Sequence, residues 1–153
     1  LFDTRSLMIK VSEVNDVYRI TGKTNPTYGD SKPNITLRKN HKYIFDFSDS
    51  SFASQGGHQF YFSTFNDGDN GGGHNSASVY LDGVTYSTET PGSTGSKVTF
   101  VVPDNAPSTL YYYNLNTANA GGTITILEDN AGKDYMLLES SNVYSSIVGQ
   151  NFG

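Results

Sequence analysis

Short runs in which apolar and polar residues alternate recur along most of the chain, and residues that favour turns separate them. Successive side chains of a β-strand point to opposite faces, so each run predicts a strand with one buried face. The runs are residues 7–11, 17–20, 34–38, 41–47, 58–62, 79–86, 97–102, 109–113 and 123–127. About eight or nine short strands with turns between them predict an all-β fold, a Greek-key sandwich.

The same alternation assigns side chains to the core. Tyr43, Phe45 and Phe47 share one face of their run, and Phe60 and Phe62 share a face with His58. We therefore expect a buried or half-buried imidazole at His58 that is hydrogen-bonded within the sandwich. His41 follows a tight turn at Lys39–Asn40 among polar neighbours, so we expect it at the solvated surface.

A tyrosine triplet follows the same rule. Leu110 and Tyr112 point one way while Tyr111 and Tyr113 point the other. One face of this run is expected in the core, and the other is expected at the sheet surface or in an interface.

The chain divides into two parts. Residues 1–127 hold the strand pattern and are expected to form the sandwich. Residues 128–153 lack the regular strand pattern of the first part. They are expected to form a C-terminal extension, or a linker to further sequence or to a neighbouring subunit. Within it, residues 134–138 are consistent with one more strand, and residues 139–150 with a short helix or a linker.

Composition excludes several classes of function. The chain contains no cysteine, which excludes disulfides, thiol nucleophiles and thiolate-bound zinc or copper. Its net charge is -5 and no cluster of lysine and arginine interrupts it, which argues against nucleic-acid binding. No stretch approaches the roughly 20 apolar residues of a membrane span.

Four segments of the chain resemble cupredoxin-like domains that are common in virion proteins of marine and cyanobacterial phages. These segments are residues 33–47, 58–62, 98–107 and 110–126. The resemblance covers roughly residues 7–127. It implies a β-sandwich that serves as a building or binding unit of an extracellular particle, in a tail, a fibre or a capsid decoration.

The resemblance also identifies a degenerate copper site. Copper-binding relatives have Tyr-Tyr-Tyr-Cys-x-x-His-x-x-Met-Gly-Gly where this chain has residues 111–122. The cysteine position is Asn114, the histidine position is Thr117 and the methionine position is Ala120, so only the upstream His58 is retained. An amide, a hydroxyl and a methyl group cannot replace these ligands. We therefore expect neither copper nor any other cofactor.

Two weaker metal candidates stand outside this frame. Asp67 and Asp69 lie in a glycine-rich stretch and are weak candidates for calcium, because the remaining ligands of a calcium loop are missing. His58 and His74 would supply only two of the ligands that a zinc site requires. The motifs of serine hydrolases, zinc proteases and phosphate-binding loops are also missing, so the sequence predicts a protein that is not an enzyme.

Two functions remain open beside a third, weaker one, a metal protein that uses His58 with His74 or the turn at Asp67 and Asp69. The first is a structural or decorating module of a virion, which contacts other virion proteins and forms a homo-oligomer within the assembly. The second is a receptor-facing module that binds carbohydrate or cell-surface protein, such as a host surface glycan, through loops at residues 66–78 and 88–96.

Overall fold

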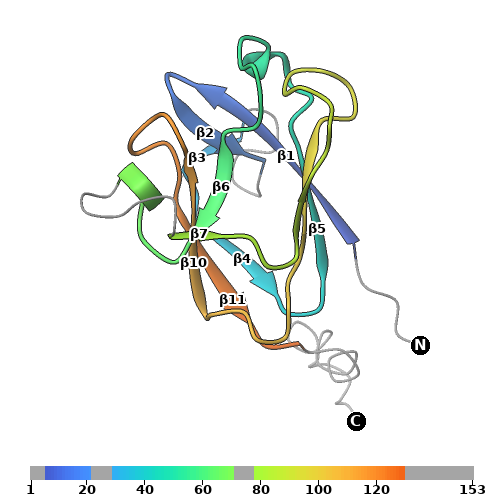
Figure 1. Cartoon of the computed structure of the whole chain (residues 1–153), viewed down its shortest axis with the longest axis vertical. Coiled ribbons are helices and arrows are strands. Elements are labelled where there is room, and N and C mark those ends of the chain that lie inside the picture. Colours follow the sequence, from blue (N-terminus) through green and yellow to red (C-terminus); the bar gives the residue numbers. More distant parts are fainter. Residues whose placement is uncertain (1–5, 22–28, 71–77, 130–153) are drawn as a thin grey trace, which may run out of the picture.

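The computed structural model describes residues 6–21, 29–70 and 78–129, which form two β-sheets packed face to face (Figure 1). The six-stranded sheet has the order β3-β2-β1-β5-β9-β8, and the five-stranded sheet has the order β4-β11-β10-β6-β7. The all-β sandwich predicted from the sequence is therefore confirmed.

The strands match most of the predicted runs. The six-stranded sheet contains β1 (Ser6–Val14), β2 (Val17–Ile20), β3 (Asp30–Ser31), β5 (Lys42–Asp46), β8 (Val84–Tyr86) and β9 (Lys97–Val101). The five-stranded sheet contains β4 (Ile35–Arg38), β6 (Phe60–Ser63), β7 (Val79–Tyr80), β10 (Thr109–Asn114) and β11 (Thr123–Leu127). Two 3-10 turns that the pattern does not reveal are η1 (Ser50–Phe52) and η2 (Gly68–Asn70).

The first hairpin shows how local sequence sets the register. Val14 of β1 lies opposite Val17 of β2, and the two residues between them, Asn15 and Asp16, have φ of 55° and 66°. A two-residue turn with two left-handed residues matches the twist of the strands that it joins, and Asn and Asp tolerate this conformation. The first half of β1 pairs in parallel with β5, so this strand joins β2 to the rest of its sheet.

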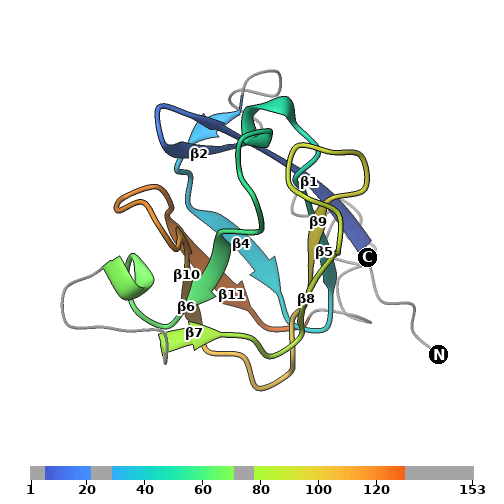
Figure 2. The same cartoon turned by 45° about the horizontal axis from the view of Figure 1, so that its top comes forward.

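The single strand and turn expected at residues 79–86 is two strands in different sheets. β7 pairs with β6 in the five-stranded sheet, and β8 pairs with β9 in the six-stranded sheet (Figure 2). The chain crosses between them at Gly83, whose φ is 80° and where any Cβ would collide with the Val101 carbonyl. Only glycine fits at this crossing.

Aromatic rings from both sheets form the core. Phe60 is fully buried, and its ring lies 4.9 Å from that of Phe47, 5.2 Å from Tyr18 and 5.3 Å from Phe45. Tilted and edge-on ring pairs at these distances add to the stabilisation that burial provides. The faces predicted for Tyr43, Phe45 and Phe47 are confirmed, because all three are buried.

Two aromatic side chains are more buried than the sequence predicted. His41 is only 9% exposed: its Nδ1 lies 3.0 Å from the Lys39 carbonyl, and its ring stacks on Tyr43. The left-handed Asn40, with φ of 64°, turns the chain back at this point, so the surface position expected for His41 is wrong. Only one face of the run at residues 109–113 was expected in the core, yet Tyr112 and Tyr113 are both buried, because η2 covers Tyr113.

The body of the fold continues two residues past β11. Glu128 forms an ion pair of 2.9 Å with Lys39, and Asp129 accepts a hydrogen bond of 3.0 Å from Asn40. The strand and helix considered for residues 134–150 lie outside the described residues. The helical turns of the described residues are single turns, far short of the length that crosses a membrane.

Candidate functional site

Asn114, to which the resemblance assigns the cysteine position, is buried at the end of β10 with 1% of its surface exposed. Its Nδ2 donates to the Tyr18 hydroxyl at 3.1 Å and to Gln59 Oε1 at 3.2 Å. Its Oδ1 accepts the backbone N–H of Asn116 at 2.7 Å. Both amide protons and the amide oxygen are thus occupied by partners within the protein.

The segment from Asn114 to β11, which we call the β10–β11 loop (residues 115–122), is fixed by backbone contacts. The Tyr18 N–H donates to the Ala120 carbonyl at 2.9 Å, and the Leu115 N–H donates to the Gln59 carbonyl at 3.0 Å. Ala120 is fully buried. The three positions that the resemblance assigns to copper ligands therefore lie in one turn, buried at Asn114 and Ala120, which offers a metal only an amide, a hydroxyl and a methyl group.

His58 is half-buried and is held by a different set of residues. Its Nε2 lies 3.1 Å from the Ser87 carbonyl, and its ring packs edge-on against Tyr86 and Phe47. This geometry places the proton on Nε2 and confirms the prediction of a hydrogen-bonded imidazole. The other nitrogen, Nδ1, is buried without a partner among the described residues. Burial lowers the pKa of His58 below its usual value of 6.5, although the Ser87 and Glu89 carbonyls oppose this shift.

The segment that contains η2 is hydrogen-bonded to the end of β10 and to the β10–β11 loop. Asn70 Nδ2 donates to the carbonyls of Asn114 at 2.7 Å and Thr117 at 3.3 Å. Asp67 Oδ2 accepts the Asn119 N–H at 3.0 Å. Gly68 lies against the Tyr113 ring, where a Cβ would collide with it. This segment therefore ties one loop to another.

The other metal candidates are only partly placed. One carboxylate oxygen of Asp67 is engaged by Asn119, while the side chain of Asp69 and the whole of His74 lie outside the described part of the chain. Asp67 and Asp69 for calcium, and His58 with His74 for another metal, stay weak candidates that the described residues do not test. Within the described ranges, no three His, Cys, Asp or Glu side chains are grouped so that they could hold a metal ion.

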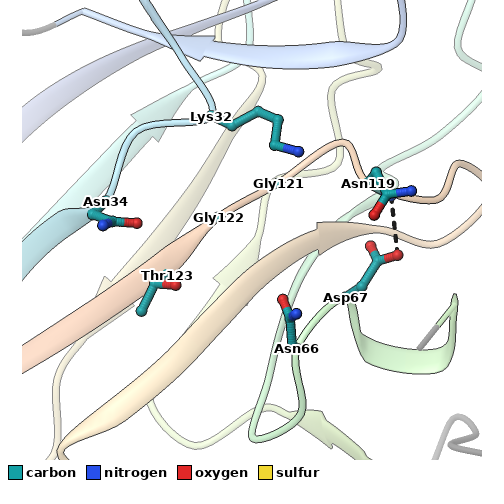
Figure 3. Close-up of a pocket in the computed structure, with 8 residues that line it drawn as sticks. All are labelled: Lys32, Asn34, Asn66, Asp67, Asn119, Gly121, Gly122 and Thr123. Atoms are coloured by element: carbon teal, nitrogen blue, oxygen red, sulfur yellow. Dashed lines mark hydrogen bonds between the residues drawn. The ribbon is translucent and has the colours of Figure 1, made fainter. Parts of the chain in front are cut away.

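A polar pocket of about 240 Å³ opens where three loops meet (Figure 3). Its floor is the backbone of Gly121 and Gly122 at the start of β11. Its walls carry side chains with hydrogen-bonding groups: Lys32, Asn34, Asn66, Asp67, Asn119 and Thr123. Asp67 Oδ1 is buried here and has no partner among the described residues.

Only part of this pocket was predictable. The loop at residues 66–78 was a candidate binding loop and contributes Asn66 and Asp67. Lys32, Asn34 and Asn119 were missed, because the approach of residues 32–34 to the β10–β11 loop is a tertiary contact. The available signal was Gly121–Gly122: a Cβ at Gly122 would lie 2.9 Å from the Pro33 carbonyl, so glycine permits this approach.

No protein-family model matches the chain, and no curated protein matches it.

Replacing Asn114 with leucine tests the role of its amide. Asn114→Leu keeps a similar volume but removes both donors and the acceptor, which leaves the Asn116 N–H and the Tyr18 hydroxyl without this partner. Removing one partner of a buried polar group costs roughly 1–3 kcal/mol. We expect the free energy of unfolding, measured by urea denaturation, to fall by about 2 kcal/mol or more.

A matched control separates the loss of the buried hydrogen bonds from the general effect of replacing asparagine with leucine. Asn105 is exposed in a turn, so Asn105→Leu should change the free energy of unfolding by no more than about 0.5 kcal/mol. Equal losses in the two variants would contradict a structural role for the Asn114 amide.

His58 predicts a pH dependence. Because burial lowers its pKa in the folded protein, the unfolded chain binds the proton more tightly, and the stability contribution of neutral His58 is lost as pH falls through 6.5. His58→Gln keeps a donor for Ser87 but does not titrate. As the pH falls from about 7 to about 5, the unfolding free energy of the wild type should therefore decrease relative to that of His58→Gln. Parallel curves would rule out the buried neutral imidazole; the raised pKa of Glu13 is common to both proteins and cancels.

Proposed function

We propose that the chain is a metal-free, non-enzymatic structural module of a phage virion, built on a cupredoxin-like sandwich. The observation that carries this proposal is the hydrogen bonding of Asn114, whose side chain stands where the resemblance puts a thiolate. All of its polar atoms bind other parts of the protein, so none is left for a metal or a substrate. The turn at the end of β10 instead holds the β10–β11 loop against Gln59 and Asn70.

The outward face of the six-stranded sheet supports a role in assembly. Met8 lies opposite Ile44 and Val101 lies opposite Lys42. Lys42, Ile44 and Val101 alternate with buried residues of their strands, whereas Met8 stands between the exposed Leu7 and the partly buried Ile9. Met8 is 57% exposed and Val101 is 41% exposed. Exposed apolar side chains on one sheet face suit a contact with other subunits, either copies of this chain or other virion proteins.

The predicted C-terminal extension is the second element of the proposal. Its first two residues, Glu128 and Asp129, are attached to the turn between β4 and β5 through Lys39 and Asn40. Residues 130–153 then join the module to neighbouring subunits or to further sequence. The sandwich does not need these residues for any of the contacts described above.

Localisation on particles tests the assignment. Gold-labelled antibodies raised against residues 6–129 should bind intact, purified phage particles in electron micrographs. A tagged full-length chain supplied during phage replication should enter the particles. The same chain ending at Asp129 should fold, with unchanged circular dichroism, but should stay out of them.

Two outcomes would contradict the proposal. Particles that carry no label would refute virion localisation. Normal incorporation of the chain that ends at Asp129 would refute the role of the extension while leaving localisation intact.

A receptor-facing carbohydrate module is the second candidate, and the pocket beside Asp67 favours it. This pocket includes Asn66 and Asp67 from the loop predicted to bind ligand, but no residue of the loop at 88–96 lines it.

A further inference from the structure

We propose that the pocket over Gly121 and Gly122 binds one hydroxyl-rich ring of a neutral sugar. The proposal rests on the second candidate function, the carbohydrate-binding module, and does not depend on which particle or surface carries it. It rests on the buried Asp67 oxygen, on the paired donors and acceptors around it, and on the balance of charge in the pocket.

Asp67 supplies the anchoring acceptor. Its Oδ2 accepts the Asn119 N–H at 3.0 Å, which fixes the orientation of the carboxylate. Its Oδ1 is buried and accepts no hydrogen bond among the described residues. A buried polar atom without a partner is costly, and a ligand donor would relieve this cost once the carboxylate turns far enough to bring Oδ1 to the surface of the pocket. In Figure 3 the carboxylate points toward the side of the pocket where Asn119 and Lys32 lie.

The remaining walls match hydroxyl groups. Asn34, Asn66 and Asn119 each carry an amide with both donors and an acceptor, and Thr123 carries a hydroxyl that does both. A sugar hydroxyl also donates and accepts, so neighbouring hydroxyls can bond a carboxylate and an amide at the same time. The glycine floor exposes backbone that a ring can approach closely.

Charge and size favour a small neutral ligand over an ion. Lys32 opposes a metal cation, and Asp67 opposes a free anion, whereas a neutral ligand can use both. The volume of about 240 Å³ lies below the range of roughly 300–1,000 Å³ for drug-sized ligands, which suits a single ring. Among the described residues no aromatic face lines the pocket, so the affinity for one ring should be on the order of millimolar.

Backbone geometry indicates that the pocket is built at some cost. Three of its lining residues, Lys32, Asp67 and Asn119, have φ of 43°, 61° and 63°. Residues other than glycine seldom adopt this left-handed backbone conformation. They do so where surrounding contacts hold them, often at ligand sites. Here the Lys32 N–H donates to the Tyr18 carbonyl at 2.9 Å, which holds one wall against β2.

Nuclear magnetic resonance tests the site directly on the full chain labelled with nitrogen-15. Glucose, galactose, mannose and N-acetylglucosamine are each titrated to about 100 mM, well above the expected dissociation constant. At least one sugar should shift the backbone amide signals of Asn119, Gly121, Gly122 and Thr123 in a saturable manner. Shifts from none of them, or shifts only at other residues, would overturn the proposal.

Substitutions identify the groups that bind. Asp67→Asn keeps an acceptor for the Asn119 N–H and tolerates the left-handed backbone, but it removes the carboxylate. It should weaken binding at least tenfold. Asp82→Asn, at an exposed residue in the turn between β7 and β8, should leave binding unchanged. Equal affinity in wild type and Asp67→Asn would refute the role of Asp67.

Two further arms keep the result decisive. If Asp67→Asn perturbs the fold, Thr123→Val removes one hydroxyl from a strand position that tolerates valine, and it too should weaken binding. Calcium chloride is titrated in parallel. Saturable shifts of the same amides with calcium but not with sugar would show a cation site and overturn the proposal.

Discussion

Tyr18 is the residue on which the arrangement of the described structure depends. Its ring is fully buried and contacts Phe47, Phe52, Phe60 and Tyr112, so it joins the aromatic core that both sheets share. Its hydroxyl accepts from Asn114, its N–H reaches the Ala120 carbonyl, and its carbonyl accepts the Lys32 N–H. Tyr18 thus packs in the core, holds the β10–β11 loop in place and holds one wall of the polar pocket.

A buried tyrosine hydroxyl needs a polar partner, and this need explains the chemistry at the end of β10. Asn114 satisfies the hydroxyl and also reaches Gln59 and the Asn116 N–H, so the amide links three chain segments. A fully satisfied polar network in the core favours one geometry, because any other leaves a buried group without its partner. The cupredoxin-like frame proposed for this chain would use a metal for the same purpose, since a metal also draws loops together.

The sequence predicted the strands well because each depends on a local property, the alternation of side chains about a strand. Tyr43, Phe45, Phe47, Phe60 and Phe62 are buried as that rule requires. Errors arose where a distant segment decides the outcome. His41 is buried because the turn at Asn40 folds its ring onto Tyr43, Tyr113 is covered by η2, and residues 79–86 divide between two sheets at Gly83. The pocket was predicted only through Asn66 and Asp67, since the approach of Lys32 and Asn34 is visible only in three dimensions.

The central claim is that hydrogen bonds from Asn114, with no metal, hold the turn at the end of β10. Thermal unfolding of protein that has been treated with a chelator, and then supplied with copper, zinc or calcium at equal concentration, tests this claim most directly. A ligand that binds only the folded state raises the midpoint of unfolding. We predict the same midpoint in all four samples. A midpoint that rises by several degrees with one equivalent of any of these metals would contradict the account.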